Sequence, residues 1–373
     1  MTKKLLFTIF TILSTIAYSQ NISLSEKAKV SILTCGTGTE SYAMYGHTGI
    51  RIQDPLNAID IVYNYGAFDF STPNFIGRFI KGDLQYFVTS GSFIDFDYNY
   101  QLENREIIEQ ELKLTPPQIN NLHQQLNQSV YSKDRFYTYK FIDRNCTTMV
   151  VDKINNILGK EYIKSTTSNQ SYREILYPYI TDFYMKLGIQ LIFGTKVDQP
   201  ATRLFLPYEF KDAISATKIN GKKIEKSTSK ILQVTKTEIP FNWLNSIYSL
   251  ITVLLILALL NKKWIKTSYF VFAGIVGLFF SLVGLYSLHE EIVWNYNILL
   301  FNPLLLIFAW YLKKGIKDKI LLFGKIILAM LLVYLAYMTT KIHLEIVWPF
   351  IALHFYWIGK IVLQIKKSNL AHS

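Results

Sequence analysis

The chain has 373 residues and a formal net charge of +12, and half of its residues are hydrophobic. This apolar content is too high and too clustered for one soluble domain, because the last third of the chain consists of apolar runs joined by lysine-rich segments. Many lysines lie at the ends of those runs, where they orient membrane helices, so the charge does not indicate a nucleic-acid partner.

Residues 1–19 have the features of a secretory signal peptide. Lys3 and Lys4 precede an apolar run from Leu5, and Ala17 and Ser19 have the spacing that signal peptidase recognises. An uncleaved anchor is the alternative. In either case the sequence predicts an exported domain over residues 20–240 and a membrane domain over residues 241–373.

The exported domain begins with β-strand patterns. Val30–Thr34 predicts a strand, and His47–Ile52 and Asp60–Gly66 predict two adjacent antiparallel strands on either side of an Asp54-Pro55 turn. This hairpin places His47 at one end of the pair.

The same hairpin brings Asn64 close to His47 across the two strands, so the Asn64 amide is the expected group that orients the imidazole. Asp60 and Tyr65 are competing orienting residues, because a shift of one residue in register would exchange their faces.

Cys146 lies at the start of a predicted helix. The apolar residues Met149, Val150, Ile154, Ile157 and Leu158 recur at helical spacing, and Gly159 marks the end. The unpaired N–H groups at a helix N-terminus favour a thiolate, which lowers the pKa of the cysteine and makes it nucleophilic. Cys146 still requires a base.

Aromatic residues are dense between Phe68 and Tyr100. They indicate a packed core, and a part of them is expected to line an acyl-chain groove if the substrate is a lipid. Further along, Ser171–Leu187 predicts an amphipathic helix, and Asn220-Gly221 predicts a hairpin turn. This stretch either docks the domain onto the bilayer or completes its core.

Five apolar segments are expected to cross the membrane: Trp243–Leu260, Ser268–Leu288, Ile298–Leu312, Ile320–Thr339 and Ile346–Leu363. The third is short unless the apolar residues from Ile292 are included. Lysines cluster after the first, third and fifth segments, which predicts an exported N-terminal domain and a cytoplasmic C-terminus.

The two outer loops share a short repeat. His289-Glu290-Glu291-Ile292-Val293-Trp294 matches His343-Leu344-Glu345-Ile346-Val347-Trp348 at five of its positions. The ordinary preference of tryptophan and polar residues for the membrane–water interface is enough to explain them in these loops. The functional hypothesis is a polar floor that binds a lipid headgroup or a lipidated substrate, with the expected substrate-binding residues His289, Glu290, Asn295, His343 and Glu345.

Cys146 and His47 form a candidate catalytic pair. A cysteine at a helix start and a histidine at a strand end make a papain-like arrangement with the chain order reversed. In an oxidising compartment a disulfide between Cys35 and Cys146 is the alternative, and it would silence the nucleophile.

Several short motifs then carry a resemblance: Thr34-Cys35-Gly36, Tyr45-Gly46-His47-Thr48-Gly49-Ile50-Arg51, Val62-Tyr63-Asn64-Tyr65-Gly66-Ala67-Phe68-Asp69-Phe70, Asn104-Arg105 and Asp143-Arg144-Asn145-Cys146-Thr147-Thr148. They resemble the periplasmic domain of the Lnb-type lipoprotein N-acyltransferases, and the likeness extends into the His289-Glu290 region and the helical tail. The resemblance implies an α+β exported domain with a permuted papain-like fold of the NlpC/P60 and lecithin retinol acyltransferase-like type. An all-α membrane domain of five transmembrane helices would follow it.

The resemblance also implies a reaction in the cytoplasmic membrane. Cys146, with His47 as base and Asn64 as third residue, would take an acyl chain from a phospholipid as a thioester and pass it to the α-amine of a diacylated lipoprotein. No metal or cofactor is expected. A phospholipase or thioesterase and a cysteine peptidase or amidase of the cell envelope remain alternatives, and so does a membrane-tethered binding module.

Overall fold

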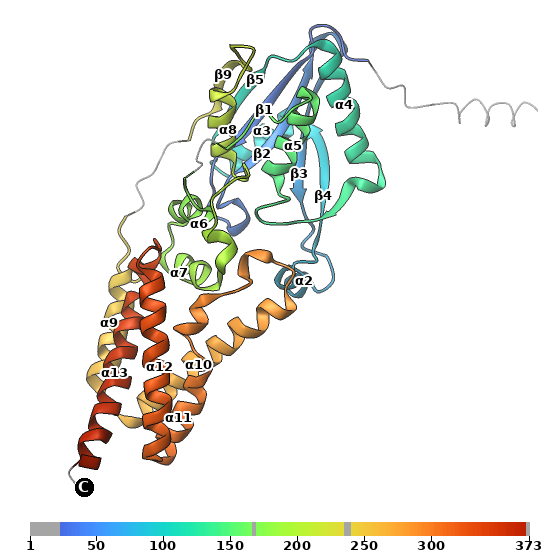
Figure 1. Cartoon of the computed structure of the whole chain (residues 1–373). Coiled ribbons are helices and arrows are strands. Elements are labelled where there is room, and N and C mark those ends of the chain that lie inside the picture. Colours follow the sequence, from blue (N-terminus) through green and yellow to red (C-terminus); the bar gives the residue numbers. More distant parts are fainter. Residues whose placement is uncertain (1–22, 166–168, 235–239, 371–373) are drawn as a thin grey trace, which may run out of the picture.

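The computed structural model describes residues 23–165, 169–234 and 240–370. The expected signal peptide lies outside the described residues. Figure 1 shows a sheet-containing domain at one end of the molecule and a bundle of long helices at the other.

The described part of the first domain contains nine strands: β1 (Lys29–Cys35), β2 (His47–Asp54), β3 (Ile59–Ala67), β4 (Gln85–Ser92), β5 (Ile107–Leu112), β6 (Phe136–Thr138), β7 (Lys218–Ile219), β8 (Lys222–Lys223) and β9 (Glu225–Leu232). Seven of them form an antiparallel sheet in the order β6-β4-β3-β2-β1-β5-β9, and β7 pairs with β8. The helices are α2 (Phe75–Lys81), α3 (Phe93–Leu102), α4 (Pro116–Tyr131), α5 (Cys146–Leu158), α6 (Tyr172–Leu176), α7 (Phe183–Ile192) and α8 (Pro207–Ala216). The exported part is thus a mixed α/β domain.

Side chains alternate between the two faces of the sheet. In β1, Val30 and Ile32 belong to the core under α4, α5 and α8, whereas Leu33 and Cys35 belong to a smaller core under α3. Both faces are therefore buried, and the end of β2 that carries His47 lies beside the start of α5.

Two sequence predictions are confirmed at their turns. Helix α5 begins at Cys146 and ends before Gly159, whose φ is +76°. The β7-β8 hairpin turns at Asn220 and Gly221, which both have positive φ.

The single helix expected over residues 171–187 is wrong. Helix α6 ends at Leu176, a 3-10 turn covers Tyr177–Tyr179, and α7 starts only at Phe183. Pro178 explains the break, because it has no N–H to donate to the preceding turn. Asp182 then caps the new helix by accepting a hydrogen bond from the N–H of Met185 at 2.8 Å.

The membrane region contains α9 (Ile247–Leu260), α10 (Lys263–Tyr286), α11 (Leu304–Lys314), α12 (Lys317–Met338) and α13 (Leu344–Leu370). Among the described residues, four stretches are long and apolar enough to cross a membrane: α10, Glu290–Lys314, α12 and α13. The second of these joins 3-10 turns at Glu290–Ile292 and Tyr296–Leu299 to α11.

Helix α9 is shorter than the expected first segment. It has 14 residues, which rise about 21 Å against a hydrocarbon thickness of about 30 Å. The structure therefore supports a multi-pass membrane region with four candidate spans.

Candidate active site

Asn145 builds the start of α5 around Cys146. The Asn145 Oδ1 atom accepts hydrogen bonds from the N–H groups of Thr147 and Thr148, each at 2.9 Å. Its Nδ2 atom donates to two backbone carbonyls, at 2.7 and 2.8 Å. The N–H of Cys146 itself has no partner in the described part of the chain, so it is free to donate to a negatively charged oxygen.

The expected contact between His47 and Asn64 is present. His47 Nε2 lies 3.1 Å from Asn64 Oδ1, and because the amide oxygen can only accept, the Nε2–H donates. This bond leaves Nδ1 as the imidazole nitrogen with a lone pair.

The competing orienting residues are engaged elsewhere. Both carboxylate oxygens of Asp60 accept from Arg51 at 2.7 Å, and the hydroxyl of Tyr65 donates to Ser129 at 3.2 Å. Asn64 is therefore the one of the three candidates that contacts the imidazole of His47.

Cys146 lies where β2 and β3 separate. The paired segment of these strands ends at Gly49 and Asn64. Just beyond it, Gly66 has a φ of +94°, and a Cβ at this position would lie 3.6 Å from the Cβ of Cys146. The backbone N–H of Thr48 donates to the Cys146 sulfur, and the Thr48 hydroxyl lies 2.9 Å from that of Thr147.

The electrostatics favour a thiolate. Burial raises the pKa of Cys146, but the charge of His47 and the hydrogen bonds from His47, Thr48 and Thr147 act in the opposite direction and outweigh it, so the pKa is lowered. Cys146, His47 and Asn64 are all half-buried, which leaves the group open to a substrate.

Cys35 is a different kind of thiol. Both cysteines are free, so the disulfide alternative is wrong for this structure. Cys35 is fully buried, and burial raises its pKa to about 12. Its protonated thiol makes it an internal control for Cys146.

We expect the alkylation of Cys146 by iodoacetamide to follow its thiolate fraction, with a pH midpoint below the ordinary value for cysteine. His47→Ala should raise this midpoint, because the imidazolium no longer stabilises the thiolate, and should lower turnover by about 10²–10⁴-fold. Mass spectrometry of the alkylated protein across pH measures the midpoint. An unchanged midpoint in the variant would show that His47 does not act on this sulfur.

The first outer loop contacts the residues that precede Cys146. Lys196 Nζ bonds both Asp143 and Glu290, the latter at 2.7 Å, and Lys140 Nζ donates to the carbonyl of Leu288 at 2.9 Å. Glu290 thus links the membrane region to residues 140–145, the catalytic loop that precedes Cys146.

Glu291 makes a second link. Its side chain is buried, and one carboxylate oxygen accepts from the N–H of Ile142 at 3.3 Å. The backbone of the same residue accepts from Gly194 at 2.7 Å. The sequence repeat matches Glu291 with Glu345, but the expected substrate-binding residue is Glu290 and not Glu291.

The other expected substrate-binding residues lie apart. Asn295 is buried and donates to the carbonyls of Leu191 and Ile192 at 2.8 and 3.0 Å. Glu345 is exposed on α13 and hydrogen-bonds Tyr177. The structure therefore places Glu290 at the catalytic loop and His289 against Phe79 of α2, whereas Asn295, His343 and Glu345 make their contacts elsewhere.

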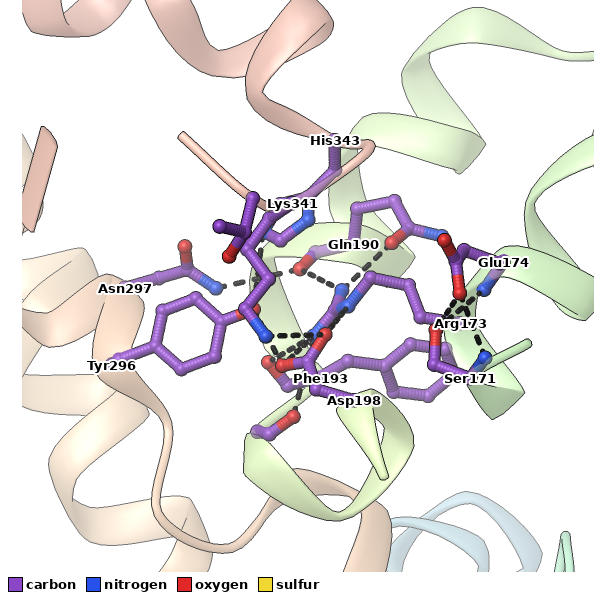
Figure 2. A network of polar contacts seen from close by, with 12 residues as sticks. Ser171, Arg173, Glu174, Gln190, Phe193, Asp198, Tyr296, Asn297, Lys341 and His343 are labelled. Carbon is purple, nitrogen blue, oxygen red and sulfur yellow. Dashed lines mark hydrogen bonds and ion pairs between the residues drawn. The ribbon is translucent and has the colours of Figure 1, made fainter. Parts of the chain in front are cut away.

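His343 belongs to a buried polar network between the two regions (Figure 2). Its Nε2 lies 3.4 Å from the hydroxyl of Tyr296, which donates to Asp198 at 2.8 Å. Asp198 in turn accepts from Arg173 at 2.7 Å, and Arg173 also donates to the side chain of Gln190 at 2.7 Å. Sequence patterns did not identify Arg173, because its partners lie 17 to 25 residues away, which is beyond the spacing that a helix or hairpin pattern reveals.

A basic groove of about 760 Å³ lies beside the catalytic loop, lined by Thr138, Lys140, Asp143, Arg144, Met149, Asp152, Lys153, Asn156 and Arg203. Arg203 pairs with Asp152 at 2.9 Å and Lys140 with Glu290 at 3.7 Å. Arg144 and Lys153 have no carboxylate partner in the described ranges, so the groove presents two cations available to an anion. Among all the residues that the structure describes, no group of three or more His, Cys, Asp or Glu side chains is placed to hold a metal ion.

Two family models match the chain. The model of the Lnb N-terminal periplasmic domain matches residues 16–177, and the model of the Lnb transmembrane domain matches residues 235–368. The first match includes His47, Asn64 and Cys146, and the second includes the two outer loops. Comparison with curated proteins finds no match, and comparison with solved structures finds none.

Proposed function

Because the chain belongs to the Lnb family, we propose that it is a lipoprotein N-acyltransferase of the cytoplasmic membrane, with Cys146 as nucleophile. The observation that carries the proposal is the pair of a lowered-pKa thiol and an imidazole, in a periplasmic domain that is bonded to the outer loops of a multi-pass membrane region. The histidine strand β2 precedes the cysteine helix α5, which is the order that a permuted papain-like fold would have.

In the first half-reaction the Cys146 thiolate attacks the ester carbonyl of a phospholipid. The N–H of Cys146 donates to the oxyanion that forms, and the imidazolium of His47 gives its proton to the leaving alkoxide. The carbon–oxygen ester bond breaks, a lysophospholipid leaves, and the acyl chain remains on sulfur as a thioester.

In the second half-reaction the α-amine of a diacylglyceryl-cysteine attacks the thioester. His47, now neutral, accepts the proton that the amine loses, and the carbon–sulfur bond breaks to restore the Cys146 thiolate. The product is an N-acylated lipoprotein. Asn64 holds the imidazole in the tautomer that both steps need.

The membrane region supports the orientation that this reaction requires. Lys263, Lys266 and Lys317 line one groove at the end of the bundle distant from the sheet domain, which suits the cytoplasmic side. Helix α10 starts at that end, so the chain must reach it from the periplasmic domain along α9. We therefore propose that α9 is a fifth, short crossing.

Reconstituted protein tests the function directly. With phospholipid alone, intact-mass analysis should find one acyl chain on Cys146. A lipopeptide with a free α-amine should then discharge the adduct and gain the chain, whereas the same peptide with a blocked amine should not. Release of free fatty acid at equal rates in both cases would instead identify a phospholipase or thioesterase, and absence of any adduct would contradict the proposal.

The basic groove predicts how the donor headgroup binds. We expect Arg144→Ala to raise the KM for an anionic or zwitterionic phospholipid about tenfold, because one charge-assisted hydrogen bond to the phosphate is lost. Arg203→Ala is the matched control, since Arg203 already pairs with Asp152 in the same groove. Measuring the KM of each variant for a phospholipid and for an acyl ester that lacks phosphate shows whether Arg144 contacts the phosphate. Equal changes for both donors would exclude a phosphate contact.

A further inference from the structure

Helix α2 exposes a row of large apolar side chains. Ile76, Phe79 and Ile80 are 72%, 51% and 45% exposed, and their spacing of three and four residues places them on one side of the helix. Because soluble surfaces rarely carry a continuous apolar row of this kind, the row indicates a binding surface.

The helix is held at the outer end of α10. The Ser287 hydroxyl donates to the carbonyl of Ile80, the N–H of Leu288 to that of Lys81, and Nε2–H of His289 to that of Phe79, each at 2.7 Å. Figure 1 shows α2 at the junction between the sheet domain and α10. Three hydrogen bonds therefore fix its height relative to the membrane helix.

The position of α2 along the axis of α10 corresponds to the membrane interface. Helix α10 has 24 residues, which rise about 36 Å against about 30 Å of hydrocarbon. Leu285 is 85% exposed near the outer end of α10 and Leu288 is 50% exposed, and the three hydrogen bonds place α2 beside this end of the helix. Arg78 is exposed on α2 and forms no salt bridge in the described residues, as suits contact with anionic headgroups.

The other end of α2 leads toward the nucleophile. The ring of Phe75 lies 5.8 Å from that of Phe68, Phe68 lies 5.4 Å from Tyr86, and Tyr86 stacks on Tyr139 at 4.4 Å. Phe75, Phe68, Tyr139 and Cys146 all pack against one core. A chain of packed aromatic rings thus runs from α2 to the neighbourhood of the thiol.

We propose that α2 lies in the outer leaflet of the membrane as an interfacial helix, with Ile76, Phe79 and Ile80 among the acyl chains. The aromatic residues behind it give the acyl chain of a lipid from that leaflet a path to Cys146, and this second part rests on the proposed function. The occupant of the exposed row is lipid, since α2 is bonded to the outer end of α10, a helix long and apolar enough to cross a membrane.

Photo-crosslinking tests the contact without requiring turnover. In the full-length Cys146→Ala protein, reconstituted in vesicles of phosphatidylethanolamine and phosphatidylglycerol, one residue at a time is replaced by the photoreactive p-benzoylphenylalanine. Ile76 is the test position. Leu285 on α10 is the positive control, and Ile94 on α3, which is 78% exposed, is the matched negative control. Intact-mass analysis after illumination counts the lipid adducts.

We expect phospholipid adducts at positions 76 and 285 and at least tenfold fewer at position 94. No adduct at position 76 with adducts at position 285 would overturn the proposal, and so would equal adduct yields at positions 76 and 94. A protein adduct at position 76 in place of lipid would identify a protein partner and would also overturn it. Because the variant lacks the nucleophile, none of these outcomes depends on the proposed acyl transfer.

Discussion

We expect Cys146→Ala to lower acyl transfer by about 10³-fold or more, because the thioester cannot form without the sulfur. In cells, Cys146→Ser should leave lipoproteins with a free α-amine, which N-terminal mass analysis detects. The proposal fails if triacylated lipoproteins persist unchanged in a strain that has no redundant enzyme.

Cys35→Ala is the matched control for this experiment. Cys35 is the only other cysteine of the chain, and its buried thiol hydrogen-bonds Tyr100 under α3. We expect the variant to keep the acyl adduct on Cys146 and to lose at most stability. If the acyl adduct were lost in Cys35→Ala but kept in Cys146→Ala, the nucleophile would be Cys35 and the proposal would be wrong.

The second large effect concerns stability. We expect Arg173→Ala to destabilise the protein by about 3–5 kcal/mol, because Arg173 is 1% exposed and its removal leaves Asp198 as a buried charge with a weaker set of partners. The carbonyls of Phe193 and Gly194, which accept from Arg173 at 3.3 and 3.2 Å, also lose a donor. Arg173→Lys should not restore stability, since one ammonium cannot reproduce a planar guanidinium that bonds several groups.

Arg203→Ala provides the control, because the Arg203–Asp152 pair lies at the surface, where the side chains are 39% and 63% exposed. Such a pair contributes about 0–1 kcal/mol. Thermal unfolding in detergent compares the two variants, and a shift of the melting temperature that is equal in both would show that the network contributes no more than a surface pair.

The same network explains how the catalytic domain is positioned. Arg173 and Gln190 come from the periplasmic part, whereas Tyr296, Asn297 and His343 come from the membrane region, and Figure 2 shows them around one buried cluster. Together with Glu290 and Glu291 this cluster fixes the height of the Cys146 loop relative to the helices of the membrane region. A nucleophile that acts on membrane lipids needs such a fixed height, because its substrates reach it from one plane.

Local patterns predicted the parts of the site that depend on neighbours in sequence. The periodicity after Cys146 and the stop at Gly159 defined α5, and the strand pattern around the Asp54-Pro55 turn brought Asn64 to His47. The pattern from Ser171 to Leu187 gave the wrong helix, because the apolar period continues through Pro178 although the backbone cannot.

The sequence by itself determined the start of the Cys146 helix, the hairpin that joins His47 and Asn64, and the division into a periplasmic and a membrane part, because a helix start, a hairpin and an apolar run are set by residues a few positions apart. Only the tertiary structure decided which polar residues of the outer loops meet the catalytic loop, and it selected Glu290 and Glu291 while it buried Asn295 and His343 in other contacts. The contacts of Glu290, Glu291 and Asn295 join residues 94 to 149 positions apart, and their geometry follows from how the domain packs on the helices.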